Sequence, residues 1–324
     1  MNIERRAFLA ASGVALVAPA SAWAQAYPAR PVKIVVGYSA GGAVDTVARA
    51  IGQAMSANLG QSFVIENKPG AGTNIAVKSV IDAPADGYTL MLAANALAAN
   101  MALYKPMPFD AERDLVPISL VGRVPVVIAA NAALPIDSLA KLIAEAKAKP
   151  GALAYATPGN GSTPHMAVEF FERAAGISLQ HVPYRGGSQA ITDVIGGQVP
   201  TLLTTLPNLI GPHQQGKVRV LAFSGERPLA TLPGVPTFAE AGYPQLTLSE
   251  VFAFFMRSEV PAAASEPLVV ALARAAQSER VVQALRKLEF EPLVLSPAEL
   301  SARLKTESAN WRRVVAESGY KVTD

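Results

Sequence analysis

The segment 33–49 constrains the fold of this chain more than any other. Its sequence is Lys-Ile-Val-Val-Gly-Tyr-Ser-Ala-Gly-Gly-Ala-Val-Asp-Thr-Val-Ala-Arg. The β-branched run at 34–36 predicts a buried strand, because such side chains pack well on a pleated surface. Gly37, Gly41 and Gly42 follow it, and glycine allows both a sharp turn and a close approach of the backbone to another group.

A helix is expected directly after this glycine loop. Asp45 and Thr46 are candidate caps, and the apolar stripe through Val47, Ile51 and Met55 predicts one buried face. Free backbone N–H groups and the positive end of the helix dipole would then converge, which favours a bound anion. The alternative is a tight strand-to-helix turn that binds nothing.

The same order of strand, glycine-rich loop and helix recurs along the chain. Loops are expected at 38–45, 67–74 and 93–96 in the first part, and at 157–165 and 183–187 in the second. Such repeats predict an α/β fold with mixed or largely parallel sheets. Ligands of these sheets bind beyond the carboxyl ends of the strands.

We predict two domains with a hinged cleft between them. Domain 1 is discontinuous and comprises 27–125 plus 250–324, whereas domain 2 comprises 126–249. A chain of 324 residues that is 51% hydrophobic is large enough for two such cores. Near the crossing between them, the apolar runs 116–122 and 125–130 are expected to form two separate strands.

Residues 1–24 are predicted to be a twin-arginine export signal. Arg5 and Arg6 precede a short apolar stretch, and small residues then mark cleavage sites near Ala24 or Ala26. We therefore expect a periplasmic protein. The remaining sequence has no uninterrupted apolar run long enough to span a bilayer.

The composition argues against several kinds of site. The chain has no cysteine, and its three histidines (His165, His181 and His213) are not spaced as metal ligands. A formal net charge of +3 is too small and too dispersed for nucleic-acid binding. We expect no metal, no cofactor and no nucleic-acid partner.

Several short segments together resemble one known family. They are 27–31, 37–45, 66–72, 86–89, 157–161, 182–187, 216–219 and 232–242. Their order and spacing are similar to those of the periplasmic receptors of tripartite tricarboxylate transporters, the Bug family, across the mature chain. The resemblance implies a two-domain periplasmic-binding-protein type II fold without a cofactor. It also implies a small carboxylate ligand (a di- or tricarboxylate, an acidic amino acid or an aromatic acid) and membrane permease subunits as partners. We expect a monomer that is not an enzyme.

The resemblance also implies which residues bind the ligand. The candidates in domain 1 are Tyr38, Ser39, Ala40, Gly41, Gly42, Asp45, Gly72, Ala94 and Asn95. The candidates in domain 2 are Thr157, Gly159, Gly161, Ser162, Thr163, His165, Tyr184 and Thr205. Arg185 and Arg49 would assist, although Arg49 is favoured as a helix-surface residue paired with an acid. We place Glu250, found where many members carry tryptophan, outside the pocket because it would repel a carboxylate.

Two alternatives remain open at this point. Residues 37–41 match the motif G-x-S-x-G, so a serine hydrolase with Ser39 as nucleophile and Asp86 and His165 as partners is the main rival. That fold requires an earlier strand to complete the oxyanion hole, and too little mature chain precedes Ser39 to supply it. The other alternative is a ligand-sensing adaptor for a sensor kinase.

Overall fold

The computed structural model describes residues 27–104 and 106–318, so the predicted export signal lies outside the described residues. The strands are β1 (Val32–Val36), β2 (Phe63–Asn67), β3 (Thr89–Ala94), β4 (Leu115–Asn131), β5 (Ala154–Thr157), β6 (Gln180–Pro183), β7 (Thr201–Thr205), β8 (Val218–Phe223) and β9 (Ser249–Arg257). The α-helices are α1 (Ala43–Leu59), α2 (Asn74–Ile81), α3 (Ala96–Leu103), α4 (Ala111–Asp114), α5 (Leu139–Ala148), α6 (Thr163–Ala175), α7 (Gly187–Ile195), α8 (Ile210–Gln214), α9 (Ala262–Gln277), α10 (Glu279–Arg286) and α11 (Pro297–Ser318). Short 3₁₀ turns are η1 (Ala71–Thr73), η2 (Leu206–Asn208) and η3 (Pro244–Leu246).

The strands form one curled, mixed sheet in the order β2-β1-β3-β9-β4-β7-β5-β6, with β8 also paired to β4. Strand β1 runs parallel to β2 and β3, and β5 runs parallel to β6 and β7. Strand β4 is antiparallel to β7, β8 and β9. The predicted α/β class with mixed sheets is confirmed.

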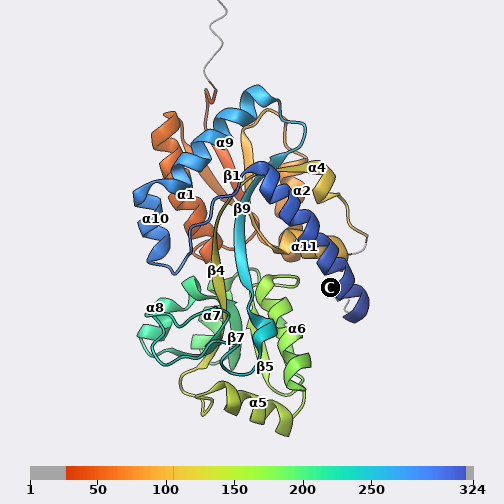
Figure 1. Ribbon diagram of the computed structural model, residues 1–324, viewed down its shortest axis with the longest axis vertical. Coiled ribbons are helices and arrows are strands. Elements are labelled where there is room, and N and C mark those ends of the chain that lie inside the picture. The colour runs from red at the N-terminus through yellow and green to blue at the C-terminus, as the bar shows by residue number, and fades with distance from the viewer. Residues whose placement is uncertain (1–26, 105, 319–324) are drawn as a thin grey trace, which may run out of the picture.

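The long strand β4 changes partners in its middle. Residues 115–125 pair with β9, whereas Val126 and the residues after it pair with β7 and β8. The apolar cores divide at the same point. Among the described residues, four of the core clusters lie wholly on one side of this point, and one small cluster, around α3, α6 and α11, has side chains from both sides. We call the part up to residue 125 and from Ser249 onward the first lobe, and 126–248 the second lobe. Figure 1 shows β4 and β9 running between the two.

The prediction of two separate strands over 116–122 and 125–130 was wrong. Both runs belong to the single strand β4. Pro117 lies next to a shift in the β4–β9 register, and Pro125 is the last residue of that ladder, opposite Ser249. Proline cannot donate to a ladder, so it is confined to such irregular or terminal positions, and in the sequence it resembles a strand end.

Helix α1 has the predicted buried stripe, because Val47, Ile51 and Met55 are fully buried. It begins earlier than predicted, with Gly42 as its N-cap, and it ends at Gly60 in the left-handed conformation. Asp45 therefore lies inside the first turn and is not the N-cap. At the other end of the chain, α11 leaves the first lobe and reaches the second beside α6 (Figure 1). Across the described ranges, every helix is too short or too polar to cross a membrane.

Candidate functional site

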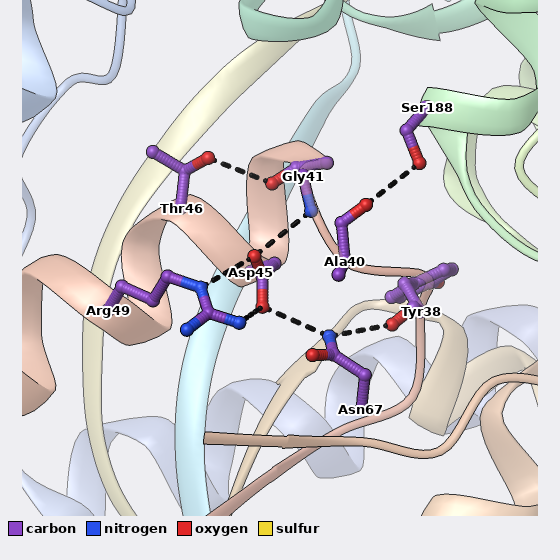
Figure 2. A network of polar contacts seen from close by, with 9 residues as sticks. Tyr38, Ala40, Gly41, Asp45, Thr46, Arg49, Asn67 and Ser188 are labelled. Atoms are coloured by element: carbon purple, nitrogen blue, oxygen red, sulfur yellow. Dashed lines mark hydrogen bonds and ion pairs between the residues drawn. The ribbon is translucent and has the colours of Figure 1, made fainter. Parts of the chain in front are cut away.

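The glycine loop after β1 is built around the carboxylate of Asp45 (Figure 2). One oxygen accepts from Gly41 N at 3.0 Å and Arg49 Nε at 2.8 Å, and the other accepts from Arg49 Nη2 and Asn67 Nδ2, each at 3.0 Å. Burial raises the pKa of Asp45, but these hydrogen bonds outweigh it and hold the pKa below its usual value. The predicted pairing of Arg49 with an acid is confirmed. Because all of these donors belong to the first lobe, Asp45 shapes the loop from within that lobe.

The tip of this loop contacts the second lobe directly. Ser39 donates to Arg185 O through both its backbone N (3.0 Å) and its Oγ (2.9 Å). Ser188 Oγ donates to Ala40 O at 3.1 Å (Figure 2). A carbonyl oxygen and a hydroxyl group of the second lobe thus form hydrogen bonds with polar groups of the first-lobe loop, at the carboxyl end of β1.

The start of α1 is held in the same way. The backbone N of Ala43 donates to Asn208 Oδ1 at 3.1 Å, and Asn208 Nδ2 in turn donates to the hydroxyls of Thr204 (2.8 Å) and Thr205 (3.1 Å). The first N–H groups of a helix have no partner within the helix, and they carry the positive end of its dipole. The second lobe therefore places an oxygen atom where an anion would bind.

A second contact between the lobes lies at their other glycine loops. Gly72 has φ +58°, and a Cβ on it would lie 2.7 Å from Asn160 O. Gly161 has φ +74°, and a Cβ there would lie 2.4 Å from Asn100 Oδ1. Only glycine satisfies both the backbone conformation and the close approach. The lobes are therefore closed on one another at two places.

Two stacked histidines support the second-lobe loop from behind. Gly161 N donates to His165 Nδ1 at 3.2 Å, and His181 Nε2 lies 2.6 Å from Thr157 Oγ1. The rings are 4.1 Å apart and nearly parallel. Burial lowers the pKa of His165 to about 3 and that of His181 to about 4, so both are neutral near pH 7. His165, predicted as a ligand contact, is buried behind the loop and helps to position it.

Three more second-lobe candidates have partners within that lobe, whereas the Thr163 hydroxyl is buried without a hydrogen-bond partner in the part of the chain that the structure describes. Ser162 is the N-cap of α6, and its Oγ donates to Gly159 O at 2.7 Å. The hydroxyl of Tyr184 donates to Asp193 Oδ2 at 2.6 Å, toward α7. The Thr205 hydroxyl accepts from Asn208, as described above. These residues shape the wall of the second lobe in its closed form.

The hydrolase triad is not assembled. The Ser39 hydroxyl donates to Arg185 O, whereas Asp86 binds Arg30 at 2.7 Å and His165 is engaged behind its own loop. Within the described ranges, no three acidic or histidine side chains gather as metal ligands. The loops that meet between the lobes therefore offer backbone donors, hydroxyls and amides.

Residues 47–320 match the family described as the tripartite tricarboxylate transporter family receptor (TctC). Protein BugT of Bordetella pertussis is 35% identical over 321 residues, which cover 97% of this chain and 96% of BugT. This chain belongs to the TctC receptor family. The family, also represented by the periplasmic binding protein BugD, consists of solute-binding receptors, so the chain is a receptor and not an enzyme.

Two solved structures resemble the receptor closely. An R. palustris protein solved with adipate has 32% identity and a TM-score of 0.86, over 90% of this chain and 98% of that one. MatC from Rhodopseudomonas palustris, solved with malate, has 28% identity and a TM-score of 0.83, over 89% and 100% respectively. The predicted two-domain fold of periplasmic binding proteins is confirmed by this likeness.

Four polar residues at the lobe boundary of the receptor were not predicted: Asn100, Ser188, Asn208 and Glu250. Asn100 is buried in the otherwise apolar α3, and a lone amide in such a helix was the available signal. Asn208 follows two threonines at the end of β7, which indicates a polar turn. Nothing local distinguishes Ser188.

Glu250, which the sequence places outside the pocket, lies on β9 with 5% exposure. It is close to Tyr38 of the first lobe and Thr163 of the second. Burial raises the pKa of Glu250 to about 7, and the nearby Thr163 hydroxyl, which is itself buried without a hydrogen-bond partner among the described residues, offsets part of this effect. Asn95 and Ala94, both predicted as ligand contacts, lie next to β9. The Asn95 side chain accepts a hydrogen bond from the β9 backbone at Val251, and Ala94 pairs with Phe252 in the sheet.

Proposed function

We propose that this receptor is exported to the periplasm, closes its lobes on a small carboxylate, and delivers it to the membrane permease subunits of a tripartite tricarboxylate transporter. The relatives solved with adipate and malate support this ligand class. The observation that carries the proposal is the meeting of loop 38–42 with Arg185, Ser188 and Asn208 across the lobes.

The polarity of the first-lobe loop favours an anion. The Ser39 amide of this loop and the Ala43 amide at the start of α1 donate to second-lobe oxygens, and the Ala40 amide has no acceptor among the described residues. When the lobes open, the first two lose their partners, and all three then face the cleft at the start of α1. Each hydrogen bond to a charged group contributes roughly 1.5–3 kcal/mol, so a few converging amides hold a carboxylate without an arginine.

We also propose that residues 27–125 with 250–324 and residues 126–249 move as two units. Within the described ranges, two strands cross between them, at the partner change of β4 and at the start of β9. Such crossings absorb backbone rotation while each core stays packed. The unit that binds ligand is a monomer, because both walls of the cleft come from one chain.

The test is a thermal-shift screen with malate, adipate, aspartate and benzoate, followed by titration of the best of them. A carboxylate at a hundred times its Kd should stabilise the receptor by about 2.7 kcal/mol. Ala40→Asp should weaken binding by about tenfold or more, because it places a negative charge at the exposed loop tip. Ala40→Asn, of the same shape without the charge, is the matched control and should bind within about threefold of the natural chain.

Glucose and putrescine serve as neutral and cationic controls in the same screen. If they stabilise the receptor and the four carboxylates do not, the proposed ligand class is wrong. If Ala40→Asp and Ala40→Asn bind equally well, the ligand does not lie at this loop.

A further inference from the structure

Glu250 is held at a fixed place between the lobes. Its Cα is opposite Val124 on β4, next to the partner change of that strand. The side chain of Asn95 forms hydrogen bonds with the backbone on both sides of Glu250: Asn95 Oδ1 accepts from Val251 N at 2.6 Å, and Nδ2 donates to Ser249 O at 3.4 Å. Asn95 thus fixes the backbone from which the Glu250 side chain starts.

Among the described residues, no cation balances the Glu250 carboxyl group. Across residues 27–104 and 106–318, no lysine, arginine or histidine forms an ion pair with Glu250, and its surroundings include the Tyr38 phenol and the Thr163 hydroxyl. A carboxylate that is buried without a positive partner is costly to a protein. At the boundary of the lobes, this cost would be offset when a bound ligand donates a hydrogen bond to the carboxylate.

Tyr38 adds an unused group at the same place. Its hydroxyl oxygen is buried and has no hydrogen-bond partner within the described residues, although most buried polar atoms have one. Tyr38 is also the residue from which the loop 38–42 starts. A ligand whose carboxylate lies on that loop therefore extends toward both Tyr38 and Glu250.

We propose that Glu250 selects ligands whose far end is a hydrogen-bond donor, such as an amide, an ammonium or a hydroxyl group, over ligands that end in a second carboxylate. This inference rests on the proposed function. A second carboxylate would meet a like charge, whereas an N–H group would donate to Glu250. A primary amide fits best, because its carbonyl oxygen can also accept from the Tyr38 hydroxyl.

The experiment compares matched ligand pairs by calorimetric titration at pH 8. The pairs are succinate with succinamate, which replaces one carboxylate by an amide, and glutarate with 4-aminobutyrate. The natural chain should bind the donor-ended member about tenfold or more tightly. In Glu250→Gln this preference should shrink to about twofold or reverse, because the charge is gone. Glu240→Gln, which changes an exposed glutamate of the second lobe, should keep the preference.

The preference should also decline as the pH is lowered from 8 to 5.5, because protonated Glu250 no longer repels a carboxylate. The Tyr38 phenol, which faces Glu250, stays neutral in this range because burial raises its pKa, and the Thr163 hydroxyl does not titrate. Equal binding of succinate and succinamate by the natural chain would overturn the inference, and this comparison does not require the variant to fold. An unchanged preference in Glu250→Gln would overturn it too. If neither pair binds, the inference fails, while the proposed function is decided separately by the four-carboxylate screen.

Discussion

At the scale of single residues, the predicted contacts divide into those that line the boundary between the lobes and those that hold its loops in place. Ser39, Ala40 and Gly72 meet the other lobe directly. Asp45 and His165 lie behind their loops and use their polar atoms within one lobe. A polar residue in one of these glycine loops can therefore either hold its own loop in place or contact the other lobe, and the sequence does not distinguish the two roles.

The stacked histidines should make the receptor sensitive to acid. A histidine whose pKa is lowered on folding stabilises the protein above its unfolded pKa of 6.5, and this stabilisation is lost as the pH falls toward the folded value. For His181 that window runs from about pH 6.5 to about 4, and the loss is roughly 3 kcal/mol at most. Glu169 and Glu172, which lie close by, have raised pKa values and act in the opposite direction.

Melting temperatures of the natural chain and of His181→Gln across pH 7 to 4 isolate this contribution. The difference between the two curves should shrink as the pH falls, because only the natural chain loses the neutral imidazole. His213→Gln, a change in α8, serves as the control. A constant difference between the natural chain and His181→Gln would contradict a neutral, buried His181.

At the scale of elements, α11 packs on the first lobe and contacts α6 of the second, so it joins the two lobes in addition to β4 and β9. Trp311 of α11 stacks on Phe170 of α6, with ring centroids 6.1 Å apart, and Ala99, Leu103 and Met166 pack beside them. This apolar contact joins the two lobes in their closed arrangement. It should therefore favour the closed form, and with it the bound ligand.

Trp311→Ala should weaken carboxylate binding by about fivefold or more, since a half-buried aromatic pair contributes about 1–2 kcal/mol. Small-angle scattering should show a larger radius of gyration for the unliganded variant than for the natural chain. Val270→Ala, which trims an exposed side chain of α9 within the first lobe, is the control. Unchanged affinity and unchanged size would mean that α11 does not affect closure.

Local patterns explain which elements could be predicted. Strand β1, its glycine loop and α1 are specified by residues that are neighbours in sequence, and their prediction was confirmed apart from the helix start. Helix α3 was missed because its alanine-rich sequence has no polar face, since both sides of it are buried. The support of Asp45 by Asn67, 22 residues away, and the burial of Glu250 arise from tertiary contacts that no local pattern records.

At the scale of the whole molecule, the two lobes are closed, and oxygen atoms of the second lobe accept hydrogen bonds from N–H groups of the first. Arg185 O and Asn208 Oδ1 stand where the oxygens of an anionic ligand would be expected. If the lobes opened about β4 and β9, these donors would lose Arg185 O and Asn208 Oδ1 as acceptors. A carboxylate could then enter and accept their hydrogen bonds instead. Closure, ligand binding and the choice of ligand would thus depend on the same boundary.

A crystal structure of the receptor with its best-binding carboxylate tests this account most directly. We predict that a carboxylate oxygen lies within about 3 Å of a backbone nitrogen of loop 38–42, with the far end of the ligand beside Tyr38 and Glu250. A ligand bound outside the boundary between the lobes, or held there by a lysine or arginine without the loop amides, would contradict it.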